Sequence, residues 1–352
     1  MRGSPLARLL LAVYALLVVY ASLYPLAGWR DHGLSALEFL IAPWPRYVVA
    51  FDVAADVVGY AVLGLLIALA LHPRLRGANA VAVATLAGAA LSIALEATQT
   101  YLPVRVASNV DVLCNTAGAM AGALAGRLFA AWVPAFGGWR ARLFLPGIQA
   151  DVGLALLGLW VFMQLNPATL LFGSGDLRHL LAGPPGTARA PEFFVAIEAV
   201  TAAANLAAAA LLASAVAAPR APVRRLILLL VLAALAVKTL AFTIILRAQD
   251  SFAWLTPGAL QGLATGLTVA LIAVSLPRVA RLAAAAVLFM AATVLVNFAP
   301  PNPYLAEILK LWQQGHFLNF NGLTRLVSLL WPFAAIGYLI VLAARRRDEA
   351  LL

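Results

Sequence analysis

Five stretches of this chain, each long enough to cross a lipid bilayer, contain no charged residue: Leu9–Trp29, Val152–Gly175, Ala199–Pro219, Ser251–Pro277 and Leu282–Ala306. A membrane-spanning helix needs about 20 apolar residues. A soluble domain cannot bury so many such runs, because its surface must face water. The chain is 64% hydrophobic and 11% charged, whereas soluble domains average about half apolar and about a quarter charged. We therefore predict an all-α, polytopic helical membrane protein.

Hydropathy predicts about ten transmembrane helices. The first apolar run has 21 residues and follows Arg2 and Arg8, which is the layout of a signal peptide. The apolar part of a signal peptide is shorter, roughly 7–15 residues, so we expect a retained first helix instead. The ten expected spans cover residues 8–28, 48–71, 79–101, 110–131, 150–171, 193–217, 225–246, 256–276, 280–298 and 323–344.

The distribution of basic residues predicts the orientation of these spans. Of the 24 Lys and Arg residues, 15 fall on one side of the membrane, eight on the other, and Lys238 within a span. Basic loops remain in the cytoplasm, so both termini are expected there. The net charge of +10 is then a consequence of topology, and we expect membrane lipids rather than nucleic acid as partners.

Cysteine and histidine give no basis for a metal or redox site. Cys114 is the single cysteine, which excludes an internal disulfide and a thiolate zinc cluster. The four histidines are scattered among loops on both predicted sides: His32, His72, His179 and His316. We expect neither a metal nor a cofactor.

Residues of similar kind recur at nearly constant spacing, which predicts duplication of a four-helix unit. Pairs separated by 142 positions are Ser22–Pro25 with Gln164–Pro167, Glu96 with Lys238, and Arg105 with Arg247. Gly118, Gly122 and Gly126 match Gly258, Gly262 and Gly266 at 140 positions, and Asp52 matches Glu198 at 146. Four spans per copy is an even number, so the predicted repeats are parallel.

The repeat suggests three parts of the chain. Residues 1–135 form the first four-helix unit and residues 136–278 the second, weakly repeated one. Residues 279–352 add two further transmembrane helices with an outer re-entrant or interfacial loop. The regularly spaced glycines are expected to let helices approach closely rather than to bind a ligand.

Eight polar residues of the first unit are predicted to gather in or near the outer half of the bilayer. An ionisable residue within a span costs on the order of 3 kcal/mol and needs a physical reason. Helical spacing puts several of them on shared helix faces, and acids outnumber cations. The candidates are Asp52, Asp56, Glu96, Gln99, Arg105, Ser108, Asp111 and Asn115.

Three interpretations of this cluster remain open. In the first interpretation, the cluster is a structural hydrogen-bond network that connects the second, third and fourth helices, with Ser108 or Asn109 as the N-cap of the fourth. Alternatively, it binds a polar or cationic headgroup or peptide at the outer leaflet. In the third interpretation it is catalytic, with paired carboxylates as acid and base and Arg105 holding an anionic group such as phosphate.

The second unit contributes three weaker candidates: Glu198, Lys238 and Arg247. Lys238 lies in the middle of a span, where a cation is costly. It is expected either to pair with Glu198 or to have a structural role.

The ordered string of motifs in the first unit resembles the VanZ-like family. The string consists of Tyr20-x2-Leu23-Tyr24-Pro25, then Asp52-x3-Asp56-x3-Tyr60-x3-Gly64, then Glu96-x2-Gln99-x2-Leu102-Pro103-x-Arg105-x2-Ser108-x2-Asp111-x3-Asn115-x2-Gly118-x3-Gly122. It covers about residues 9–130. One departure is Asp56, where the family pattern has asparagine. The rest of the chain resembles the extended helical half of longer bacterial members.

The resemblance implies a protein of the bacterial inner membrane. The founding member of the family is associated with low-level resistance to the glycopeptide teicoplanin. By analogy, the chain would act at the extracytoplasmic face on a lipid-linked or wall-related envelope compound, or on a glycopeptide drug bound there. Two alternatives are a secondary transporter or lipid flippase, and an integral membrane enzyme acting on a lipid-linked substrate.

Overall fold

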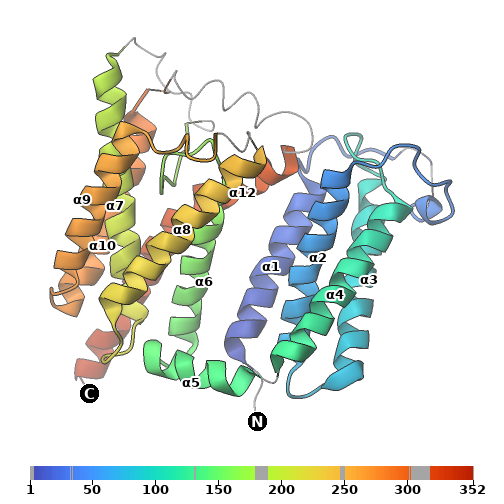
Figure 1. Ribbon diagram of the computed structural model, residues 1–352, viewed down its shortest axis with the longest axis horizontal. Coiled ribbons are helices and arrows are strands. Elements are labelled where there is room, and N and C mark those ends of the chain that lie inside the picture. The colour runs from blue at the N-terminus through green and yellow to red at the C-terminus, as the bar shows by residue number, and fades with distance from the viewer. Residues whose placement is uncertain are drawn as a thin grey trace. The chain divides into compact units, whose positions relative to one another are not determined.

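A computed structural model describes residues 4–31, 33, 35–130, 132–178, 189–245, 250–300, 302 and 318–351 of the chain. Within these residues the backbone is helical apart from connections, and the one extended contact is an isolated bridge between Phe144 and Ala217. Figure 1 shows long helices joined by connections of different lengths. The predicted all-α class is confirmed.

Nine helices of the described part are long and apolar enough to cross a membrane. The chain is therefore a multi-pass helical membrane protein. Its longer helices are α1 (Pro5–Leu23), α2 (Ala50–Leu71), α3 (Gly77–Gln99), α4 (Asn109–Ala130), α6 (Ile148–Phe162), α7 (Pro191–Val216), α8 (Val223–Ile245), α9 (Pro257–Ala273), α10 (Arg278–Phe298) and α12 (Leu318–Leu351).

Two predicted spans differ from the structure. The span expected over 256–276 is α9, which has only 17 residues. The span expected over 150–171 consists of α6 and a 3-10 turn, Met163–Leu165, and ends there. Pro167 explains the early end, because proline disfavours helical backbone at the preceding residue, here Asn166. An 11-residue helix, α5 (Val133–Leu143), was not predicted.

The chain forms two compact units, Met1–Arg140 and Ala141–Leu352. The finer division of the second part at residue 278 stays a prediction.

In the first unit, α4 packs closely against α2 along a line of glycines. A Cβ atom added at Gly118 or Gly122 would collide with the backbone carbonyl of Val57 or Ala61, respectively. Small residues therefore set the distance between these two helices, as is usual for helix pairs in membranes.

In the second unit, α7 is the central helix. It contacts α6, α8, α9 and α10, and almost every residue from Thr201 to Val216 is buried. Most of these residues are alanines, which allow neighbouring helices to approach the α7 backbone from several directions.

The glycines of α9 repeat the arrangement seen in α4. A Cβ atom at Gly262 would lie 2.7 Å from the carbonyl oxygen of Ala199, and one at Gly266 would lie 2.8 Å from that of Ala203. Each unit thus packs its fourth helix on the carbonyls of its second helix at four-residue intervals. The duplication of a four-helix unit stays a prediction.

Candidate functional site

The predicted polar residues of the first unit lie at one end of it. Successive spans alternate in direction, so α1 and α3 end where α2 and α4 begin. Figure 1 shows the α1–α2 and α3–α4 connections together at the end opposite the N-terminus. We call this group the outer cluster, after the side of the membrane that the sequence predicts for it: Asp52, Asp56, Glu96, Gln99, Arg105, Ser108, Asp111 and Asn115.

Glu96 and Ser108 join the end of α3 to the start of α4. Glu96 is 5% exposed, and its Oε2 accepts a hydrogen bond of 2.9 Å from the backbone N–H of Ser108. The hydroxyl of Ser108 accepts from the backbone N–H groups of Val110 and Asp111, at 3.2 and 3.4 Å. Ser108 therefore caps α4, whose first N–H groups have no partner within the helix.

Gln99 and Arg105 satisfy carbonyls at the end of α1. Gln99 Nε2 donates to the carbonyl oxygen of Ser22 at 2.9 Å, and Arg105 Nη2 donates to that of Ala21 at 2.8 Å. The last carbonyls of a helix lack intrahelical partners, so these contacts stabilise its terminus. They also connect α1 to α3 and to the loop that follows it.

Arg105 faces carboxylates from three helices. Burial lowers the pKa of its guanidinium, and the negative charges of Glu96, Asp56 and Asp111 act in the opposite direction. The Nε atom of Arg105 is buried and has no hydrogen-bond partner among the described residues. The Nη2 atom of the guanidinium is thus bound to α1, while Nε has no hydrogen-bond partner among the described residues.

Asn115 connects α4 with α3. Its Nδ2 donates to the hydroxyl of Ser92 at 2.9 Å, and both residues are buried. Its Oδ1 is buried without a hydrogen-bond partner in the described part of the chain. A buried polar atom of this kind costs free energy unless something else satisfies it.

The aspartates form the more open side of the outer cluster. Asp52, in the first turn of α2, is exposed, whereas Asp56 and Asp111 are half-buried. Asp56 lies close enough to Asp52, Asp111 and Arg105 to interact with them electrostatically. The excess of carboxylates over cations favours a ligand group that is cationic or rich in hydrogen-bond donors. Within the described residues, no group of His, Cys, Asp and Glu side chains has the arrangement to hold a metal ion.

In the second unit, Lys238 is bonded to backbone carbonyls. Its Nζ donates to the carbonyl oxygens of Asn166 and Thr169 at 2.7 and 2.9 Å, and the residue is 1% exposed. Glu198 is half-buried beside Gly258 at the start of α9, and it interacts with Lys238 electrostatically. The contacts of Lys238 are those of a structural residue rather than of a direct ion pair with Glu198. Arg247 lies outside the described residues.

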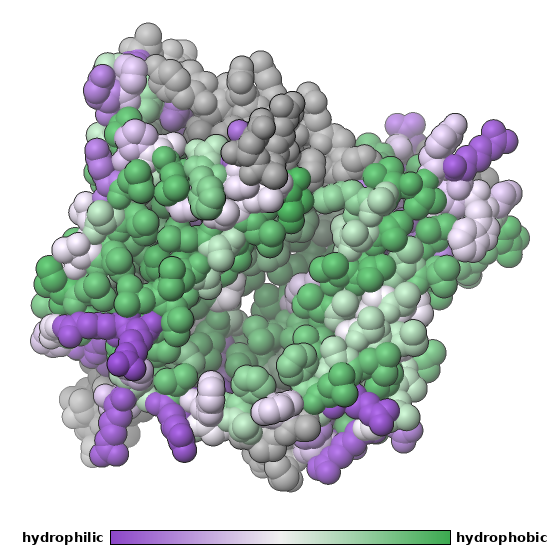
Figure 2. Space-filling view, viewed as in Figure 1, coloured by the Kyte–Doolittle hydropathy of each residue, from purple (hydrophilic) through white to green (hydrophobic). Residues whose placement is uncertain are grey.

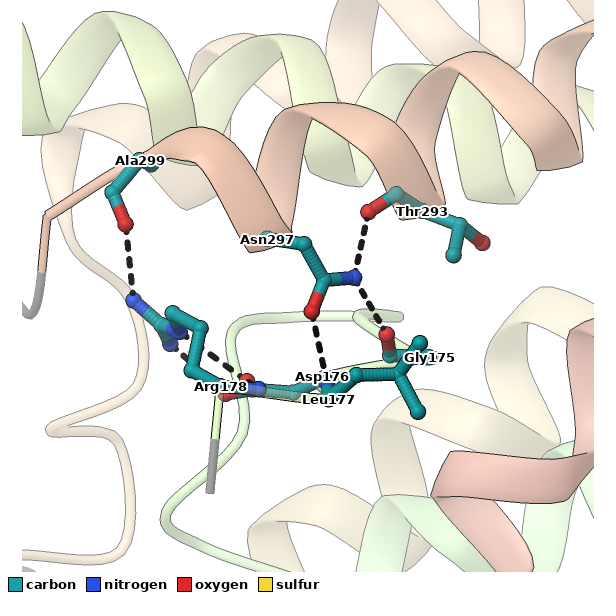
Figure 3. A network of polar contacts seen from close by, with 7 residues as sticks. All are labelled: Gly175, Asp176, Leu177, Arg178, Thr293, Asn297 and Ala299. Atoms are coloured by element: carbon teal, nitrogen blue, oxygen red, sulfur yellow. Dashed lines mark hydrogen bonds and ion pairs between the residues drawn. The ribbon is translucent and has the colours of Figure 1, made fainter. Parts of the chain in front are cut away.

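Lys238 is one of several side chains that hold a buried, non-helical segment at residues 166–178. Figure 3 shows a second one, Asn297 of α10, which faces this segment. Asn297 Nδ2 donates to the carbonyl of Gly175 at 2.7 Å, and Asn297 Oδ1 accepts from the N–H of Leu177 at 2.7 Å. The N–H of Gly175 in turn donates to the carbonyl of Ser328 at 2.8 Å. Irregular backbone within a membrane protein requires such partners.

An ion pair between Arg178 and Asp176 lies at the end of the same segment. Arg178 binds both carboxylate oxygens of Asp176, at 2.9 Å from Nε and 2.6 Å from Nη2, and Nη1 donates to the carbonyl of Ala299 at 3.3 Å (Figure 3). A bidentate pair of this geometry is among the stronger charge-assisted contacts. It links the segment to the end of α10.

Several of these partners were not predicted from the sequence. Ser92 and Asn297 are polar residues within apolar helices, and that was the available signal. The carbonyls of Asn166 and Thr169 carry no signal, because every residue has one.

One part of the chain matches a known protein family. Residues 10–130 match the model of the family described as VanZ/LLP1. No curated protein and no solved structure matches the chain. The matched region contains all eight residues of the outer cluster and ends at Ala130, the last residue of α4.

Proposed function

We propose that the outer cluster binds an envelope compound, because residues 10–130 match the VanZ/LLP1 family model and the described helices are long and apolar enough to cross a membrane. The site would face the outside of the bacterial inner membrane, with both termini in the cytoplasm. The ligand would be a lipid-linked or wall-related compound, or a glycopeptide drug. Binding there would contribute to resistance of the teicoplanin type.

The observation that carries this proposal is the environment of Arg105. Its guanidinium is half-buried, keeps an unsatisfied Nε and faces Glu96, Asp56 and Asp111. A purely structural arginine would be expected to use its donors on protein acceptors. The adjacent carboxylates, which lie on the more open side of the outer cluster, can instead bind complementary groups of a ligand, and the acid excess favours one that carries an amine.

The proposed sidedness rests on charge. The positive-inside rule puts the less basic loops outside, and in this topology the outer cluster belongs with those loops. A site in that position can meet compounds of the outer leaflet and the wall without transport across the membrane.

The test replaces Arg105 by glutamine, which keeps a polar side chain that can donate hydrogen bonds but has no charge. Arg30→Gln is the matched control, because Arg30 is an exposed arginine in the loop after α1. Both variants and the wild type are expressed in a strain that lacks the gene. Membrane level, thermal melting and susceptibility to glycopeptides and other envelope drugs are then measured.

We expect Arg105→Gln to accumulate and melt like the wild type but to lose the susceptibility phenotype, whereas Arg30→Gln keeps it. If Arg105→Gln retains the full phenotype, the outer cluster does not bind the ligand. If it fails to accumulate, the outer cluster is a structural hydrogen-bond network that connects α1, α3 and α4.

A further inference from the structure

A shallow pocket of about 400 Å³, open to the surface, lies in the second unit where α8 begins and α9 ends. We call it the arginine cavity. Its lining residues are Pro222, Val223, Arg224, Arg225, Val274 and Ser275. Figure 2 shows hydrophilic side chains gathered at this end of α8 and α9, next to the apolar surface of the helices.

The charge of the arginine cavity is not neutralised by the described protein. Arg224 and Arg225 are both exposed, and Arg224 Nη2 makes one long contact, 3.4 Å, with the hydroxyl of Ser275. Among the residues that the structure describes, no carboxylate is ion-paired with either arginine. The cavity therefore presents two guanidinium groups to whatever enters it.

The start of α8 adds positive potential to that of the side chains. The first turn of a helix has unpaired N–H groups and the positive end of the helix dipole, which favour acidic residues there. The first turn of α8 contains no acid and instead carries Arg224 and Arg225. A bound anion would offset this unfavourable arrangement and would also find backbone donors.

The position of the arginine cavity narrows the identity of the anion. Because α8 is a membrane-spanning helix of 23 residues, its first turn lies where the hydrocarbon region meets the headgroup region. Planar guanidinium groups match the oxygens of phosphate in a bidentate manner. Basic pockets between transmembrane helices on the cytoplasmic side are suited to anionic lipid headgroups.

We propose that the arginine cavity binds the phosphate group of an anionic phospholipid. This site is on a different unit from the outer cluster and does not depend on the proposed function. The shared chemistry is phosphate recognition, so free phosphate is the other source that the experiment must separate.

The test uses the purified full-length chain in detergent, titrated with dioleoylphosphatidylglycerol or dioleoylphosphatidylcholine and followed by native mass spectrometry. Inorganic phosphate is added in excess in a separate arm. The variant is Arg224→Gln combined with Arg225→Gln. Its matched control is Arg74→Gln combined with Arg76→Gln, which removes two charges at the start of α3, away from this cavity. We expect the first variant to bind phosphatidylglycerol about tenfold more weakly, and the control to bind like the wild type.

A second variant, Ser275→Phe, fills the cavity without changing its charge. It is also expected to lose phosphatidylglycerol binding, and it guards against a folding defect of the double arginine variant. If inorganic phosphate binds with the same arginine dependence and phosphatidylglycerol is not preferred over phosphatidylcholine, the ligand is free phosphate and the lipid proposal is overturned. Equal weakening by the control, or full binding by Ser275→Phe, would show general surface attraction and would also overturn it.

Discussion

Glu96 Oε2 accepts a hydrogen bond of 2.9 Å from the backbone N–H of Ser108, so the end of α3 is tied directly to the start of α4. The same Ser108 caps α4 through its hydroxyl. The carboxylate of Glu96 and the hydroxyl of Ser108 therefore hold α3, α4 and the loop between them together. Because Arg105 lies within that loop, these contacts also help to position it.

Replacing Glu96 by alanine should destabilise the chain by about 2 kcal/mol, because the N–H of Ser108 loses its acceptor in a buried setting. Glu96→Gln keeps an oxygen acceptor and should cost much less. The midpoint of thermal unfolding in detergent measures both. A glutamine variant as unstable as the alanine variant would contradict this account and would show that the charge is what matters.

A methyl group added at the glycine contacts should destabilise both units. Gly122→Ala and Gly262→Ala each force α4 or α9 away from the backbone of its partner helix, at a cost of about 1–3 kcal/mol. Gly158→Ala is the control, because nothing lies within 4 Å of the added atom and alanine is the better helix former. Thermal melting should fall for the first two and stay or rise for the third. Melting that falls for only one of the two would argue against equivalent packing in the units.

Much of the fold was predictable from apolar runs and helical spacing. The runs identified the membrane spans to within a few residues, since a bilayer admits little but helices of that length. The spacing of Asp52 and Asp56, and of Glu96 and Gln99, placed them on shared faces at one end of the first unit. The role of these residues and the sidedness of the membrane stay predictions.

The segment at residues 166–178 was not predictable in the same way. Its leucines and phenylalanine are as apolar as those of a span, so hydropathy extended the helix to residue 171. The local signs of a break were Pro167 and the Gly173-Ser174-Gly175 sequence. The contacts that make the irregular path possible come from Lys238 and Asn297, which are 72 and 120 positions away from their partners Asn166 and Leu177. Such distant contacts leave no periodic pattern in a single sequence.

Asn297→Ala should destabilise the second unit by about 2 kcal/mol, because the carbonyl of Gly175 and the N–H of Leu177 both lose a partner. The matched control is Thr268→Ala, which removes an exposed side chain bonded only to a carbonyl one turn earlier in its own helix. Thermal melting should drop for the first and change little for the second. Similar melting of the two variants would mean that Asn297 does not hold the segment.

Lys238→Met tests whether the buried lysine is structural. Methionine is close to lysine in shape but cannot donate, so the carbonyls of Asn166 and Thr169 would lose their partner, at a cost of about 2–3 kcal/mol. Removing a buried charge also removes its desolvation cost, which stabilises the folded state. We expect the loss of two hydrogen bonds to outweigh that gain in stability. Leu240→Met, at a position 52% exposed on the same helix, is the control and should melt like the wild type. A Lys238→Met variant that melts at or above the wild-type temperature would show that the stability of the fold does not depend on the hydrogen bonds from Lys238 to these carbonyls.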